Sequence, residues 1–130
     1  FANSNRAVHL KDLRTIDQVP VDLWMGWSNG KWEGDTLVVE TIANDDRTWL
    51  DRAGNYHSNQ MKVTERFTLL DASRIQYEAT IDDPETFTAP WTIAMHLYRN
   101  NEPNAELLEF KCVEFSENLL YNEFLKEPLP

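Results

Sequence analysis

The chain has 130 residues with 42% hydrophobic and 26% charged side chains, a composition typical of one globular domain rather than a disordered segment. Its formal net charge of −10 disfavours nucleic-acid binding, because phosphate groups would be repelled. No segment approaches the roughly 20 consecutive apolar residues that a membrane-spanning helix needs, so we expect no membrane span.

The cysteine count and the first residue set two further expectations. Cys112 is the single cysteine, which excludes an internal disulfide and a cysteine-based zinc site, and we expect no cofactor. The chain starts at Phe1 rather than Met and shows no signal peptide, so we expect either that an N-terminal segment was processed away or that the chain is a piece of a longer protein. We expect one β-rich domain over 1–130, with an irregular lead-in at 1–23, a sheet over 24–112 and a tail at 113–130.

Strand and turn signals begin early in the chain. The lead-in contains one possible short strand at residues 6–10. Pro20 is expected to end the irregular lead-in. Residues 31–40 predict two strands that meet at Gly34-Asp35, because these residue types tolerate the positive φ of tight hairpin turns. Residues 43–60 are polar and without periodicity. A connection of this length is typically functional or mobile.

The second half of the chain predicts further strands and one helix. Residues 61–70 and 74–81 form a hairpin around Asp71-Ala72-Ser73, and strands are expected at 91–99 and 105–112. Ser116 is a suitable N-cap for a short helix over 116–126. Strands joined by short turns without intervening helices favour an antiparallel meander. We expect a small barrel or a curved sheet, with a calycin-like fold as one possibility and a sandwich as the alternative.

The strand at 61–70 carries the main candidate for chemistry. Side chains alternate between the two faces of a strand, so Glu65 shares a face with Met61, Val63, Phe67 and Leu69. A carboxylate facing inward must be paired, hydrogen-bonded or protonated. It is therefore either a functional acid or base with a raised pKa or half of a structural ion pair, for which an arginine from the long loop is the expected partner.

The polar loop supplies the other candidate site residues. If the loop folds over the end of the sheet, His57 and Asp51 converge with Glu65 into a proton-transfer set. Ligand-binding roles are predicted for side chains in or beside the loop, namely Arg47, Trp49, Tyr56 and Arg66. The alternative is that the loop is a solvated connector whose Trp49 and Leu50 tuck into the core.

Metal, nucleophile and phosphate motifs are weak or absent in the sequence. The spacings typical of zinc ligands are missing, and the aspartates of the loop lack the regular calcium-binding spacing, so we predict no metal. No Gly-x-Ser-x-Gly elbow or glycine-rich phosphate loop is present.

One patterned stretch resembles a family of uncharacterised bacterial proteins that are generally exported. The resemblance covers roughly residues 24–112 and is carried by WEGDTLVVET at 32–41, NDDRTWLD at 44–51, HS at 57–58, TERF at 64–67 and IDDP at 81–84. Where that family usually has a Gly-Phe pair, this chain has Ile42-Ala43. The resemblance implies a periplasmic or extracellular location, and it implies that this chain is the C-terminal part of a longer precursor that starts with a secretion signal and an additional β-rich segment. It implies no activity.

Three functions follow as hypotheses. The first is an exported binding or accessory domain whose aromatic-rich pocket takes a small apolar or aromatic molecule or a protein partner. The second is a small lyase, isomerase or hydrolase that uses Glu65 and His57, with Arg47 or Arg66 holding an anionic substrate. The third is a structural subunit of a larger assembly.

Overall fold

The computed structural model describes residues 5–105, and the chain divides into two units. One comprises Phe1–Asn5 and Glu102–Pro130, of which only Asn5 and a turn at 102–105 are described; the Ala105 amide donates to the Glu102 carbonyl there (3.1 Å). The other, Arg6–Asn101, holds the whole described sheet. The predicted helix at 116–126 and the predicted strand at 105–112, apart from Ala105, lie outside the described residues.

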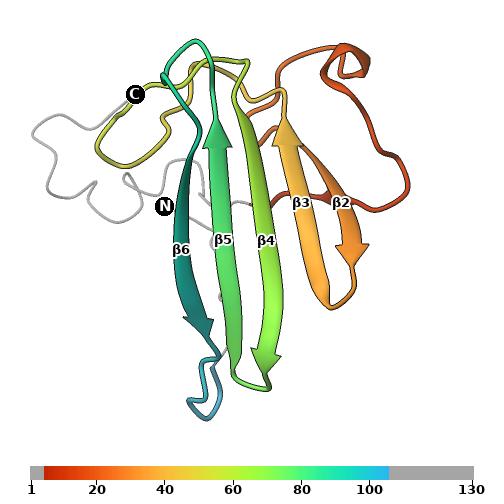
Figure 1. Ribbon diagram of the computed structural model, residues 1–130, viewed down its shortest axis with the longest axis vertical. Coiled ribbons are helices and arrows are strands. Elements are labelled where there is room, and N and C mark those ends of the chain that lie inside the picture. Colours follow the sequence, from red (N-terminus) through yellow and green to blue (C-terminus); the bar gives the residue numbers. More distant parts are fainter. Residues whose placement is uncertain (1–4, 106–130) are drawn as a thin grey trace, which may run out of the picture. The chain divides into compact units, whose positions relative to one another are not determined.

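Six strands form one sheet whose spatial order is their sequence order (Figure 1). The strands are β1 (Val8–His9), β2 (Trp27–Glu33), β3 (Thr36–Ile42), β4 (Lys62–Asp71), β5 (Arg74–Asp82) and β6 (Trp91–Tyr98), and a 3₁₀ turn, η1 (Ile16–Gln18), lies between β1 and β2. β2 to β6 pair antiparallel, whereas β1 pairs parallel with β2. The mainly β prediction is confirmed, with a mixed rather than a wholly antiparallel sheet.

The sheet is open, so the predicted barrel is wrong for the described part of the chain. β1 and β6 are its two edges and do not pair with each other. β1 is only two residues long, which leaves too few backbone groups to close a ladder against the eight residues of β6.

The two predicted hairpins are confirmed. Gly34 has φ of +59° in the turn between β2 and β3, the conformation for which glycine was expected. Residues 72–73 connect β4 to β5, and the Asp71 carboxylate accepts a hydrogen bond from the Ser73 amide (2.9 Å).

Strand register assigns each side chain to one of two faces, which we name after a glutamate on each. The Glu65 face carries Ser28, Val39, Thr41, Val63, Glu65, Tyr77, Ala79, Ile81 and Ile93. The Glu40 face carries Asn29, Lys31, Val38, Glu40, Ile42, Lys62, Thr64, Glu78 and Asp82.

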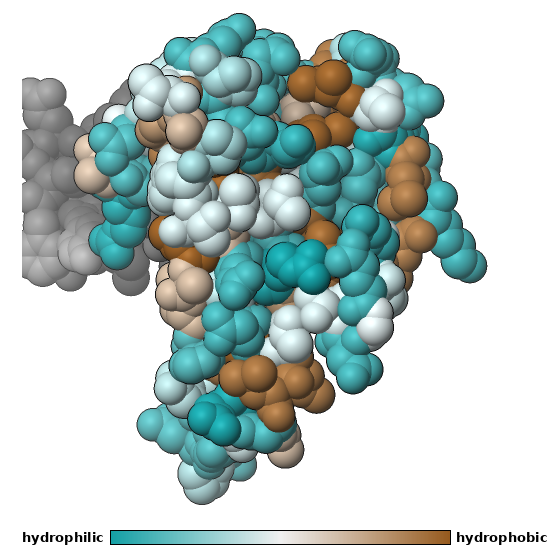
Figure 2. Space-filling view, viewed as in Figure 1, coloured by the Kyte–Doolittle hydropathy of each residue, from teal (hydrophilic) through white to brown (hydrophobic). Residues whose placement is uncertain are grey.

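Both faces contribute to a small core. On the Glu65 face Met61, Ala79 and Ile81 are buried together, with Leu50 and Phe87 packed against them. Val38 and Ile42 are buried on the Glu40 face. Elsewhere hydrophobic side chains reach the surface, and Figure 2 shows them as separate groups among hydrophilic residues.

Membrane-spanning helices are not found in residues 5–105, because no helix there has both the length and the apolar character required.

Candidate functional site

Glu65 faces inward, as strand periodicity predicts, and its carboxylate is fully engaged. Only 7% of the residue is exposed. Arg6 Nη2 forms an ion pair with Glu65 Oε2, and the Tyr77 hydroxyl donates a hydrogen bond to Glu65 Oε1 (2.8 Å). The partner arginine comes from the lead-in and not from the long loop, so that part of the prediction is wrong.

Arg6 extends this cluster toward β2. Its Nη1 donates to Thr41 Oγ1 (3.2 Å), and Thr41 Oγ1 lies 2.8 Å from Ser28 Oγ. Ser28 and Thr41 are buried. The guanidinium therefore has an acceptor on each of two neighbouring strands, which is an arrangement for holding the lead-in against the sheet rather than for transferring a proton.

Tyr77 gives this cluster a measurable signature. Burial and the hydrogen bond to Glu65 raise the pKa of the Tyr77 phenol from 10.0 to about 12. Because the raised pKa favours the neutral phenol, the hydrogen bond stabilises the fold below pH 10 and this contribution is lost as the pH rises through about 12.

We expect one of the four tyrosines of the native protein to ionise near pH 12, and this step to vanish in Tyr77→Phe. Tyrosinate absorbance measured against pH is the test. A native protein in which no tyrosine ionises near pH 12 would contradict the buried hydrogen bond.

His57 is buried and held at both ring nitrogens. Its Nδ1 lies 3.0 Å from the Ser58 carbonyl, which can only accept, so Nδ1 carries a proton. Its Nε2 lies 2.7 Å from Thr48 Oγ1, and the Thr48 hydroxyl is also 2.8 Å from the Asp45 carbonyl. These contacts tie two parts of the loop together. No described hydrogen bond links His57 to Glu65 or Asp51.

Asp51 organises a tight turn in the loop. Its carboxylate accepts hydrogen bonds from the Ala53 amide (2.8 Å) and from Asn55 Nδ2 (2.6 Å), and Gly54 supplies a φ of +85°. The hydrogen bonds from Asn55 lower the pKa of Asp51. The three residues predicted as an acid–base set thus have separate partners.

The predicted ligand-binding arginines are also paired within the protein. Arg47 Nε donates to Asp45 Oδ1 (2.8 Å), which holds the pKa of Asp45 down to about 2, and the guanidinium lies 4.9 Å from the Trp24 ring centroid. Arg66 is on the Glu40 face and donates to Glu33 Oε2 (2.9 Å). The two arginines therefore do not face a common site.

Asp83 belongs to the IDDP stretch at 81–84, but its structural role was not predicted from the sequence. Its carboxylate is 1% exposed and accepts hydrogen bonds from the Ser58 amide (2.7 Å) and the Ser58 hydroxyl (2.6 Å). Burial raises the pKa of Asp83, but the hydrogen bonds from Ser58, Thr86 and the Glu85 amide together outweigh it, and the net shift is downward. The aspartate before Pro84 was the available signal, since Asp-Pro pairs commonly begin turns.

An aromatic cavity of about 370 Å³ lies between the long loop and the segment before β6. Its lining consists of Leu50, Asp51, Asn55, Tyr56, Thr86, Phe87 and Trp91. The Phe87 and Trp91 rings meet edge to face, with centroids 5.7 Å apart. Tyr56 is the one predicted ligand-binding residue in this lining, whereas Trp49 is 70% exposed and lies outside it.

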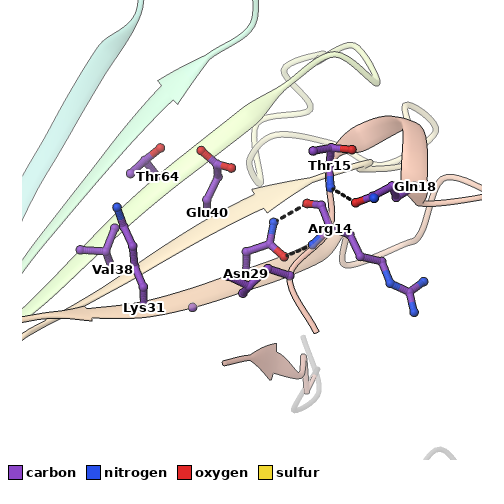
Figure 3. A pocket seen from close by; sticks show the side chains of 10 residues that line it. Arg14, Thr15, Gln18, Asn29, Lys31, Val38, Glu40 and Thr64 are labelled. Carbon is purple, nitrogen blue, oxygen red and sulfur yellow. Dashed lines mark hydrogen bonds between the residues drawn. The ribbon is translucent and has the colours of Figure 1, made fainter. Parts of the chain in front are cut away.

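Two further cavities, of about 360 and 370 Å³, lie on the Glu40 face and share Arg14, Thr15 and Glu40 in their linings. We call them together the Glu40 groove. Figure 3 shows the first, where the Glu40 and Thr64 side chains stand beside each other and Arg14, Thr15 and Gln18 border the space. Glu40 was not among the site residues predicted from the sequence. Its alternation with Val38 and Ile42 was the same signal that identified Glu65.

Within residues 5–105, no group of three or more histidine, cysteine, aspartate or glutamate side chains is placed to hold a metal ion. The sequence matches no protein-family model, and comparisons with curated proteins and with solved structures also find no match.

Proposed function

We propose that this domain binds a small apolar or aromatic molecule in the aromatic cavity. The observation that carries the proposal is the lining itself, because Tyr56, Phe87 and Trp91 surround a space of about 370 Å³. Binding sites for small molecules are mostly apolar hollows of this order of size with a few polar groups at the rim, and here Asp51 and Asn55 provide the polar groups.

Binding is favoured over acid–base catalysis because the candidate catalytic groups are already engaged. Glu65 is neutralised by Arg6 and accepts the Tyr77 hydroxyl, and His57 bridges Thr48 and Ser58. A general acid or base needs a face open to the substrate. The remaining sequence-based expectations, an exported location and a calycin-like curvature of the sheet, stay proposals beside this one.

The test uses indole and naphthalene as probes and measures binding by chemical-shift changes of backbone amides. We expect shifts at the cavity residues, and Tyr56→Ala should weaken binding about fivefold or more, because stacking on an aromatic ring contributes about 1 kcal/mol. Tyr98→Ala is the matched control, since Tyr98 is also an exposed tyrosine, at 71% against 56% for Tyr56, but lies outside the cavity lining. Equal weakening by both variants, or no binding to the wild type, would rule the proposal out.

A second candidate function, docking of a protein partner, has its own observation. Register aligns an apolar row across the Glu65 face, consisting of Trp32, Leu37, Phe67, Tyr77 and Met95. Trp32 is 62% exposed, and so is Leu69 beside the row. Large exposed apolar patches commonly mark interaction surfaces. If this face docks a partner, Leu69→Lys should abolish co-purification with that partner while leaving indole binding unchanged.

A further inference from the structure

We infer that the Glu40 groove is a second binding site, and that it takes a primary alkylammonium group. This site is on the opposite face of the sheet from the Glu65 cluster and shares no lining residue with the aromatic cavity. It is therefore independent of the function proposed above.

The carboxylate of Glu40 is the first argument. Glu40 is half-buried, lines both cavities of the groove and makes no hydrogen bond or ion pair within residues 5–105. The other charged groups of the lining are paired. Arg14 contacts Asp12 (2.9 Å), Lys31 contacts Glu33 (2.7 Å) and Lys62 contacts Asp82 (3.8 Å). Glu33 also accepts a hydrogen bond from Arg66 (2.9 Å), so these pairs do not cancel one to one. Glu40 is nevertheless the carboxylate of the groove lining that has no described cationic partner, and a carboxylate in that position favours a cation.

Thr64 provides a neighbouring acceptor. It pairs directly with Glu40 across β3 and β4, so the two side chains stand on the same face, as Figure 3 shows. The Thr64 hydroxyl also has no described hydrogen-bond partner. An ammonium group carries three donors, and a carboxylate with an adjacent hydroxyl satisfies two of them from one side.

The rest of the lining fits an alkyl chain. Leu13 and Val38 border the first cavity, and Ile42 borders the second. Asn29 is already occupied, because it bonds the Arg14 backbone through both its amide nitrogen (2.7 Å) and its oxygen (2.9 Å). These two hydrogen bonds hold the Arg14 backbone against β2, and Arg14, Thr15 and Gln18 form one wall of the first cavity. An amine can therefore place its charge on Glu40 and its methylene groups against Val38 and Leu13.

The test titrates the protein with pentylammonium and follows backbone amide shifts of β3 and β4. We expect saturable binding to the wild type, and Glu40→Gln should weaken it about tenfold or more, because a hydrogen bond to a charged group is worth roughly 1.5–3 kcal/mol. Pentanol and pentanoate, which have a similar chain but no positive charge, should bind far more weakly. Comparing pentylammonium with Nα-acetyl-lysine amide then distinguishes a free amine from a lysine side chain as the natural source.

Glu78→Gln is the matched control. Glu78 is also half-buried on the Glu40 face and without a described partner, but it lies outside the groove. It removes the same charge, so it should leave pentylammonium binding unchanged. Thr64→Val tests the site without altering charge and should also weaken binding. If pentylammonium does not bind the wild type, or binds it no better than Glu40→Gln or than pentanol does, the inference is wrong.

Discussion

Arg6→Met is expected to lower the free energy of unfolding by about 3 kcal/mol, because it leaves the Glu65 carboxylate buried without its cation. Tyr77 would still donate one hydrogen bond to Glu65. The Arg6 side chain is 29% exposed, which places the effect at the lower end of the range for buried pairs. Urea unfolding followed by tryptophan fluorescence measures the change.

A control variant and a double variant distinguish the loss of the Arg6–Glu65 pair from the loss of any arginine. Arg66→Met removes an ion pair with Glu33 in which the arginine side chain is 42% exposed, and it should cost less than about 1 kcal/mol. The double variant Arg6→Met/Glu65→Met should be clearly more stable than the sum of the single effects predicts, because neither charge is then left alone. If Arg6→Met and Arg66→Met cost the same, the Arg6–Glu65 pair does not hold the lead-in against the sheet.

The inward direction of Glu65 was predictable from sequence, whereas its partner was not. Alternation along 61–70 is a local property, and it places a carboxylate among apolar side chains without reference to the rest of the chain. Arg6 lies 59 residues away from Glu65 in sequence and reaches it because β1 pairs parallel with β2. A two-residue strand has too little periodicity to predict that pairing.

In the long loop, contacts between residues close in sequence were the ones that could not be predicted. His57 and Asp51 have the residue types of a catalytic set, and the sequence cannot show that nearby backbone groups use their polar atoms. Hydrogen bonds inside the loop occupy the polar side-chain atoms of both His57 and Asp51. Glu40 was not predicted for a different reason, because the hairpin signal in residues 31–40 comes from the turn residues and not from the alternation of side chains along the strand. The groove above Glu40 depends on residues 13–18, which have no strand or helix pattern.

Two glycines share a backbone conformation but differ in the space around them. Gly26 and Gly34 have φ of +63° and +59°. A Cβ at Gly34 meets nothing within 4 Å, so Gly34→Ala should cost only the left-handed strain of about 1–2 kcal/mol. A Cβ at Gly26 would lie 2.6 Å from Asn44 Oδ1 and 2.8 Å from the Ile42 carbonyl oxygen. Backbone cannot move aside as a flexible side chain can, so Gly26→Ala should cost about 3 kcal/mol or more.

Gly26→Ala should also disturb the aromatic cavity, whereas Gly34→Ala should not. Gly26 packs closely against residues 41–44, where β3 ends and the long loop begins, next to the bridge between Leu23 and Asn44. Displacing Asn44 moves the start of the loop that carries Leu50 and Tyr56 to the cavity. We therefore expect indole binding to weaken in Gly26→Ala under conditions where urea unfolding shows that the variant is still folded. Equal midpoints of unfolding for the two variants would mean that the close packing at Gly26 does not constrain the loop.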